Sequence, residues 1–340
     1  MPLLKPIFPF MQRIHLPILG KGIKGIGLLK IKEGEVNKQS LYTSCLTRNS
    51  SDAKLSWVLP PRLKTYRIEG GIGVMNMIVC VKQVLDPEAP PASFKIDPAT
   101  SKVVPPPGVS PVVDPYGEYA IEAALKIKDA LGGKITAISL GINLLRDVIK
   151  KPLSMGADEL ILLEDEAFIE GDSWSTAYAM AMAIKKIGEY DLILCGREAS
   201  DSNAGQVGLG IAEVLGLPSV TLARKIDITD SKARVERVTA DGYEVVEVSL
   251  PALITASNEI GEPRYPTIKG IMAAKRKEPI IWKPADIGVE PAQIGAAGQR
   301  TKTFKLFQPV HEGKCEIMGG ETPEEAAANL ALKLREAKIL

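Results

Sequence analysis

The chain has 340 residues, of which 45% are apolar and 24% are charged, and its formal net charge is +1. This composition suits one large globular domain or two ordinary ones, and the sequence contains no run of about 20 apolar residues that could span a membrane. Four cysteines without CxxC spacing and only two histidines argue against a zinc site and a disulfide framework.

The first quarter of the chain differs from the rest in charge. Residues 1–76 contain 12 Lys or Arg and 4 Asp or Glu, net +8, so the remaining residues contain 30 and 37, net −7. This acidic body argues against a nucleic-acid-binding surface. Prolines interrupt the apolar run near the N-terminus, which is therefore not typical of a signal peptide. We expect residues 1–76 to be a disordered basic extension or, as we favour, sequence upstream of a native start at Met75 or Met77.

Regular patterns begin at Met77 and alternate between strands and helices. Short apolar runs predict strands at residues 77–85, 134–141, 157–165 and 190–196. Helical spacing predicts helices at residues 116–131, 144–156 and 173–188. Such alternation is typical of an α/β fold with a doubly wound, mainly parallel sheet.

Local signals refine this pattern at three places. Asp114 is expected to cap the first helix, with Pro115 at its first position. Residues 94–104 predict a hairpin around Asp97-Pro98. Pro152 falls in the middle of the second helix, where it must kink or break the helical hydrogen bonding.

Residues 196–208, GREASDSNAGQVG, are the stretch most suggestive of a ligand. They follow an apolar strand and precede a helical pattern. A loop of this kind delivers the unpaired N–H groups of a helix N-terminus to a phosphate. The alternative is an ordinary connection, because glycine and polar residues are common in any loop between a strand and a helix.

The last third of the chain changes pattern. Short alternating runs predict an antiparallel addition or sheet extension at residues 219–228, 233–239, 242–250 and 251–257. Beyond Lys277 prolines and glycines predict an extended arm, which ends in a helix capped by Thr322. We therefore expect a domain at residues 77–278 and an arm at residues 279–340 that lies on a partner, a flexible tail being the alternative.

Several of these segments together resemble the beta subunit of electron transfer flavoprotein, the family that includes FixA. They are CVKQV, MGAD, GREASDSNAGQVG and GEPRYPTIKGIMAAKRK, and the resemblance runs from Met77 essentially to the C-terminus. Ala240 departs from the family, in which an acidic residue is usual at this position. The resemblance implies a Rossmann-like domain of the adenine nucleotide alpha-hydrolase type.

The resemblance also implies a function. The chain would pair with an alpha subunit that holds most of a redox-active FAD, and it would have no catalytic residue of its own. The heterodimer would accept electrons from acyl-CoA dehydrogenase-type flavoproteins and pass them to a quinone-linked oxidoreductase, in the bacterial cytoplasm. The beta subunit would bury AMP in a carrier, which we favour, or a second FAD in an electron-bifurcating, NADH-dependent member. A third possibility is a free-standing, non-redox nucleotide-binding protein of the stress type.

The family's nucleotide site, carried over position by position, brings together four parts of the chain. Its residues would be Cys80, Asp114, Pro115, Tyr116, Gly117, Leu140, Gly196, Arg197, Asp201, Ser202, Asn203, Ala204, Gly205, Gln206 and Val207. We expect backbone N–H groups from residues 204–207 to face phosphate, with Asp201, Ser202, Asn203 and Gln206 fixing it. Arg197 would offset phosphate charge or else be a solvated loop residue. Cys80 would act through its backbone and shape, since thiols in apolar strands are usually inert.

The segment GEPRYPTI resembles the family's recognition loop, whose apolar tip docks into the dehydrogenase. The residues implied in partner binding are Ile260, Glu262, Pro263, Arg264 and Tyr265. Read without the family, Ile260 would be a core residue. The resemblance instead makes it the docking anchor.

Overall fold

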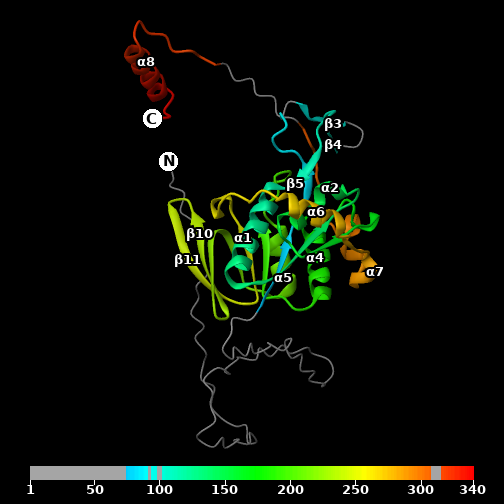
Figure 1. Cartoon of the computed structure of the whole chain (residues 1–340). Helices are drawn as coiled ribbons and strands as arrows, with labels where there is room; N and C mark the ends of the chain where they lie inside the picture. Colours follow the sequence, from blue (N-terminus) through cyan, green and yellow to red (C-terminus); the bar gives the residue numbers. More distant parts are fainter. Residues whose placement is uncertain (1–73, 91–92, 98–101, 308–314) are drawn as a thin grey trace, which may run out of the picture. The chain divides into compact units, whose positions relative to one another are not determined.

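The computed structural model describes residues 74–90, 93–97, 102–307 and 315–340 (Figure 1). Its centre is a nine-stranded sheet in the order β11-β10-β9-β12-β8-β1-β6-β7-β13. These strands are β1 (Met75–Cys80), β6 (Gly133–Leu140), β7 (Glu159–Leu163), β8 (Leu192–Gly196), β9 (Ser219–Thr229), β10 (Lys232–Thr239), β11 (Gly242–Ser249), β12 (Ala252–Ala256) and β13 (Ile280–Trp282). From β9 to β13 all neighbours are parallel, whereas β9, β10 and β11 pair antiparallel.

Helices cover both faces of this sheet, which confirms the doubly wound α/β fold. They are α1 (Pro115–Leu131), α2 (Arg146–Ile149), α3 (Lys151–Met155), α4 (Ser173–Ile187), α5 (Val207–Leu215), α6 (Ile268–Arg276) and α7 (Pro284–Ile287). A further helix, α8 (Pro323–Glu336), has no buried residue. Residues of α1, α3 and α6 share one buried apolar cluster, and residues of α4, α5 and α7 share the other. Successive side chains of β1 point to opposite faces of the sheet, so Val79 lies in the first cluster and Ile78 in the second.

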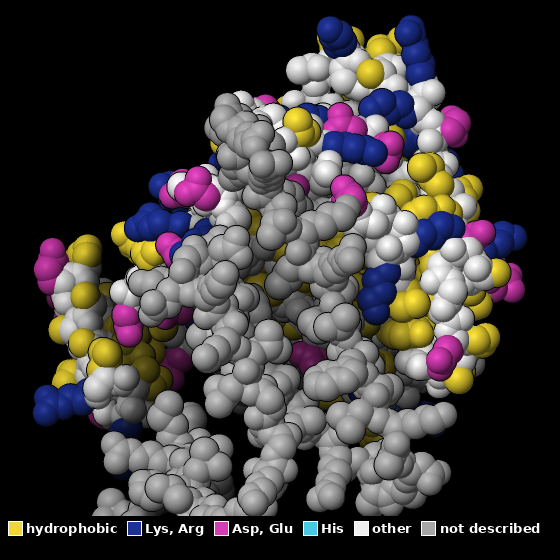
Figure 2. Space-filling view, turned by 90° about the horizontal axis from the view of Figure 1, so that it is seen from below, with side chains coloured by type: hydrophobic (Ala, Val, Ile, Leu, Met, Phe, Trp, Pro, Cys, Tyr) yellow, Lys and Arg dark blue, Asp and Glu magenta, His cyan; other side chains and the backbone are white. Residues whose placement is uncertain are grey.

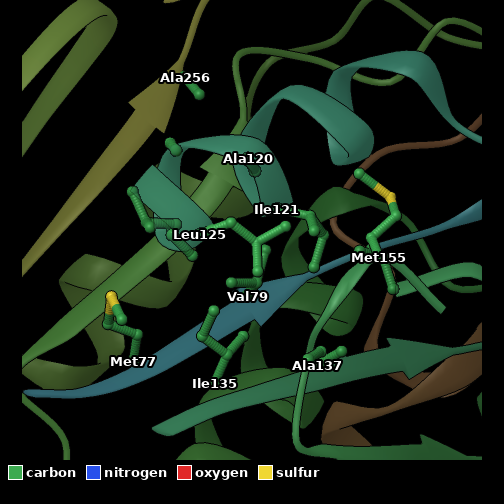
Figure 3. Packing of buried hydrophobic residues seen from close by; sticks show 14 of the residues in the cluster. Met77, Val79, Ala120, Ile121, Leu125, Ile135, Ala137, Met155 and Ala256 are labelled. Atoms are coloured by element: carbon green, nitrogen blue, oxygen red, sulfur yellow. The ribbon is translucent and has the colours of Figure 1, made fainter. Parts of the chain in front are cut away.

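The first cluster lies between α1 and the parallel strands. Figure 3 shows Ile121 and Leu125 of α1 directed at Val79 of β1, with Ile135 and Ala137 of β6 beside them. None of these side chains is more than 3% exposed. Strands buried on both faces need continuous apolar runs, and this explains why the parallel strands were recognisable from the sequence.

The predicted break at Pro152 is confirmed. The structure has two short helices, α2 and α3, in place of one, and they meet at Lys150. Pro152 stands in the first turn of α3, where its missing N–H would have no partner inside the helix. Here a proline that would interrupt one long helix begins a second one.

Two predictions about the sheet need correction. Residues 252–256 form β12, which is a parallel strand inserted between β8 and β9 and not part of the antiparallel addition. All five of its residues are buried, and this lack of alternation is the pattern of a central parallel strand. In addition, β1 begins at Met75, so it includes the last two residues of the predicted N-terminal segment 1–76. The rest of that segment, up to residue 73, lies outside the described residues.

The predicted start of the arm at residue 279 is also wrong. Residues 280–282 form β13, which pairs with β7, and Ile287 and Ile294 are buried in the second cluster. From Gln299 to Phe307, in contrast, every residue is exposed. The helix α8 is confirmed with Thr322 as its cap, and it contains no buried residue. Outside the sheet, β3 (Lys95–Asp97) and β4 (Lys102–Val104) form the predicted hairpin, and β2 (Gln83–Leu85) pairs with β5 (Pro111–Val113).

Asp172 binds the backbone at the start of the exposed segment, residues 299–307. Its Oδ1 accepts a hydrogen bond from the N–H of Ser175 at 3.0 Å, and its Oδ2 accepts from the N–H groups of Arg300 and Thr301 at 2.8 and 2.9 Å. The Arg300 guanidinium lies over the ring of Trp174 at 3.5 Å. Burial alone would raise the pKa of Asp172, but these backbone donors and the Thr301 hydroxyl outweigh it and hold the pKa well below its usual range.

We expect Asp172→Asn to reduce the free energy of unfolding by about 1–3 kcal/mol at neutral pH, because the amide accepts fewer of these bonds. A depressed native pKa means that the contribution is present above the unfolded value of about 4 and is lost as the pH falls towards the native pKa. Urea denaturation should therefore show the largest difference from wild type at neutral pH and a shrinking one below about pH 4. Asp286→Asn, at the exposed cap of α7, is the control. Equal stability of Asp172→Asn and wild type at pH 7 would contradict this role.

Candidate functional site

The carboxyl ends of β1 and β8 lie at the point where the chain reverses its direction across the sheet. From β1 the chain proceeds through β6 to β7 on one side, and it then returns to place β8 on the other side. Ligands of open parallel sheets bind in the crevice outside such a switch point. The segments that follow these two strands begin at Val81 and Arg197, and the N-terminus of α1 lies against them.

Gly196, the last residue of β8, allows this close approach. A Cβ atom on Gly196 would lie 2.6 Å from Cβ of Tyr116, and 2.7 and 2.8 Å from its carbonyl carbon and oxygen. Side chains do not tolerate contacts of this length with backbone. A glycine is therefore required here because the first turn of α1 packs directly on the strand end.

Asp114 joins α1 to the loop at residues 197–206. It is 2% exposed and caps the helix, as predicted, with Oδ1 accepting from the N–H of Tyr116 at 2.8 Å. Its Oδ2 accepts from the N–H and the hydroxyl of Ser200, at 2.7 and 2.9 Å. One buried carboxylate thus satisfies donors in two segments that are 86 residues apart.

The charged residues of the loop are paired within the protein. The Arg197 guanidinium lies over the Tyr116 ring at 5.3 Å and contacts the carboxylate of Glu198 at 2.9 Å. Asp201 contacts Lys82, in the segment after β1, at 2.7 Å. An ionised carboxylate can only accept hydrogen bonds, so Asp201 in this geometry holds Lys82 and is not a donor to phosphate. Arg197 and Lys82 nevertheless place two cations at the rim of the site.

Apolar residues form the floor between the strand ends. Cys80, Leu140 and Val207 are half-buried and pack against the same apolar cluster, which includes Cys195 of β8. The hydrogen bond with the Cys195 thiol, followed by burial, raises the pKa of the Cys80 thiol well above its usual value. The Cys80 thiol therefore stays protonated at neutral pH, as expected of an inert thiol.

The N-terminus of α5 has the donors that a phosphate needs. Its cap, Gln206, makes no side-chain capping bond, and the side chains of Ser202 and Asn203 are exposed beside it. Asn203 and Gly205 have φ values of 48° and 61°, so the loop turns sharply before the helix starts. Backbone N–H groups at a helix N-terminus, short polar side chains and an apolar floor fit an adenine nucleotide by their donor chemistry.

Three predicted site residues, Pro115, Gly117 and Ala204, remain to be placed. Pro115 is the first residue of α1, Gly117 is buried beneath it, and Ala204 is exposed in the loop. A Cβ on Gly117 would only touch Val81 at 3.5 Å, so the close approach at Gly196 is not repeated here. Sequence reasoning did not assign Lys82 to the site, although this residue stands within the segment CVKQV that it singled out.

The predicted docking segment leaves the sheet after β12. Ile260 is 7% exposed and belongs to the first apolar cluster, so the expectation of an exposed apolar tip at Ile260 is wrong in this structure. Arg264 is bound by Glu122 and Asp129 of α1 at 2.9 Å. Tyr265, in contrast, is 93% exposed. The exposed apolar side chains of this segment are therefore Tyr265 and, at its end, Ile268.

Further properties of the described surface bear on function. Figure 2 shows Lys and Arg side chains interspersed with Asp and Glu side chains on the face seen from below. Among the described residues, no group of three or more His, Cys, Asp or Glu side chains is arranged to hold a metal ion. Within the same part of the chain, no helix combines the length and apolar character that crossing a bilayer requires.

Comparison with known proteins agrees with this architecture. The profile of the family described as "Electron transfer flavoprotein domain" matches residues 108–287. The chain is 40% identical over 267 residues to the caffeyl-CoA reductase-Etf complex subunit CarD of Acetobacterium woodii, and the match covers 78% of this chain and 100% of CarD. The chain is also 40% identical over 267 residues to the electron transfer flavoprotein subunit beta of Thermoanaerobacterium thermosaccharolyticum, and this match again covers 78% of this chain and 100% of the relative. Protein FixA of Azorhizobium caulinodans is 35% identical over 243 residues, which are 69% of this chain and 85% of FixA.

Proposed function

The chain belongs to the electron transfer flavoprotein beta-subunit family, and from this premise we propose that it forms a heterodimer with an alpha subunit. The heterodimer accepts electrons from flavoprotein dehydrogenases of the acyl-CoA type and passes them to a quinone-linked oxidoreductase in the cytoplasm. An FAD shared with the alpha subunit supplies the redox chemistry when it is bound. The residues of this chain help to bind, orient and shield that FAD.

The convergence of Gly196, Asp114 and the α5 N-terminus carries the proposal of a nucleotide site. Asp114 ties the loop to α1, and Gly196 lets α1 close over the strand end. Phosphate would bind at the N–H groups of residues 204–207 and beside Ser202 and Asn203. The apolar floor at Cys80 and Leu140 would support the flat faces of a base or sugar.

AMP is our first choice for this site, and a second FAD is the other candidate. AMP requires only one phosphate position, and the N-terminus of α5, which has no side-chain cap and whose neighbouring charges are paired, supplies one. The second FAD is favoured by a specific observation, the 40% identity to a subunit of a caffeyl-CoA reductase-Etf complex. With a second FAD, the heterodimer would oxidise NADH and bifurcate its electrons, and it would be an enzyme in its own right.

Nucleotide analysis of the heterodimer tests the proposal. The chain would be co-expressed with a candidate alpha subunit, purified and denatured, and the released nucleotides would be separated and quantified. One FAD and one AMP per heterodimer support the carrier. Two FADs that NADH reduces support the bifurcating alternative. A chain that purifies alone, without flavin, contradicts both and favours a free-standing nucleotide-binding protein.

Docking is tested by two substitutions with opposite expectations. Tyr265→Ala should weaken docking to the dehydrogenase about 10- to 100-fold with little change in stability, because the ring is exposed and buries its area only against a partner. Ile260→Ala should cost about 2–4 kcal/mol of folding free energy, because it leaves a cavity in the core. Electron transfer at limiting dehydrogenase and thermal unfolding measure the two effects. Unchanged transfer by Tyr265→Ala, with Glu262 and Pro263 intact, would remove this segment from the interface.

A further inference from the structure

A buried carboxylate ties the docking segment to α1. Glu122 is 4% exposed and projects from α1 towards residues 260–264. Its Oε2 accepts hydrogen bonds from the backbone N–H and from Nε of Arg264, at 3.0 and 2.9 Å. Its Oε1 accepts from Nη2 of Arg264 at 3.0 Å. One carboxylate therefore holds both the side chain and the backbone of a single loop residue.

Two further residues of α1 lie on the same face, since residues four and seven apart are neighbours on a helix. Lys126 Nζ donates to the carbonyl oxygen of Ile260 at 2.7 Å, and Asp129 accepts from Nη2 of Arg264 at 2.9 Å. The carboxylate side chains differ in exposure, at 5% for Glu122 and 61% for Asp129. A desolvated, bidentate pair is much stronger than an exposed one, so Glu122 dominates this contact.

The arrangement leaves Arg264 with its guanidinium turned into the fold and Tyr265 with its ring in solvent. The side chain of Arg264 is 36% exposed and is occupied by its two carboxylate partners. Tyr265 follows directly, at 93% exposure. The direction in which Tyr265 projects thus depends on where α1 holds its neighbour.

We propose that Glu122 is a positioning residue for partner docking, and that Arg264 acts through it and not by contact with the dehydrogenase. This inference rests on the proposed function, because it assigns to α1 the task of presenting the docking segment. Glu122 holds Arg264, Arg264 fixes the backbone, and the fixed backbone presents Tyr265 in one orientation. A pre-ordered segment loses less conformational entropy when it binds a partner.

The test compares Glu122→Gln with Glu118→Gln in the purified heterodimer. Glu118 is also on α1, but its carboxylate pairs with Lys151 of α3 and forms no hydrogen bond or ion pair with the described residues 260–264. Hydrogen exchange of residues 258–267 should become about 10- to 100-fold faster in Glu122→Gln and stay unchanged in Glu118→Gln. In steady-state transfer, the KM for the dehydrogenase should rise about tenfold in Glu122→Gln while kcat stays at the wild-type value.

A second variant protects the test from a simple folding defect. Arg264→Lys keeps the charge but loses the bidentate geometry, so it should accelerate exchange in the same residues and by a smaller factor. Wild-type exchange in both variants overturns the positioning role. Faster exchange with an unchanged KM overturns its link to docking. If the wild-type heterodimer transfers electrons from no dehydrogenase, the proposed function fails, and the exchange data alone still decide whether Glu122 holds the segment.

Discussion

Gly196→Ala is expected to disrupt the proposed nucleotide site. The new methyl group would lie within 2.8 Å of the backbone of Tyr116, and backbone cannot move aside as a flexible side chain can. Either α1 shifts away from β8 or the strand end distorts, at a cost of about 3 kcal/mol or more in the free energy of unfolding. Nucleotide that copurifies with the heterodimer should fall below about a tenth of the wild-type amount. Chemical denaturation and nucleotide quantification measure the two effects.

Gly117→Ala is the matched control for this prediction. It adds the same methyl group at a position where the nearest atom, Cα of Val81, lies at an ordinary contact distance of 3.5 Å. Because Gly117 lies inside α1, alanine should be neutral or should stabilise the helix by up to about 1 kcal/mol. Equal losses of stability in the two variants would show that the approach of α1 to β8 is not what requires glycine at position 196.

Asp114→Ala is expected to have the second largest effect. The substitution leaves three donors without their acceptor, namely the N–H of Tyr116 and the N–H and hydroxyl of Ser200. The lost cap and the unsatisfied buried groups together should cost about 2–4 kcal/mol of folding free energy. The loop at residues 197–206 should also lose its attachment to α1, so nucleotide retention should fall as well.

Asp165→Ala provides the comparison for Asp114. Asp165 makes the same kind of cap, with Oδ1 accepting from the N–H of Ala167 at 3.0 Å, but it does so at an exposed site with one donor. Its removal should cost less than about 1 kcal/mol and leave nucleotide content unchanged. If Asp114→Ala behaves like Asp165→Ala, the bridge to Ser200 contributes nothing to the site.

The sequence was most informative where local chemistry decides the structure. The cap at Asp114, the break at Pro152 and the apolar parallel strands all follow from neighbouring residues. The position of β12 could not be predicted in this way, because it comes after three antiparallel strands in sequence and yet lies inside the parallel part of the sheet. Its unbroken burial distinguishes it from its neighbours, and the mostly apolar sequence ALITA is the one local sign of that burial.

In the candidate site, too, the features set by neighbouring residues could be predicted and those set by distant residues could not. The loop at residues 196–208 could be found from its pattern, but the contacts that shape it come from distant residues. Lys82 reaches Asp201 across 119 residues, and Asp114 reaches Ser200 across 86. Ile260 is a case in which the plain apolar reading, a core residue, describes the structure better than the position implied by resemblance. Burial depends on tertiary packing, which a motif comparison does not contain.

The order of the strands has a consequence for how the chain folds. β12 occupies the slot between β8 and β9, although β9, β10 and β11 are all synthesised before it. The antiparallel strands can pair with one another early, since their contacts are local, but β9 must not pair with β8 before residue 252 is available. Until β12 inserts, β8 and β9 each carry an open edge during translation. A ribosome-bound chain that ends before β12 should therefore aggregate or recruit a chaperone, and one that extends beyond α6 should not.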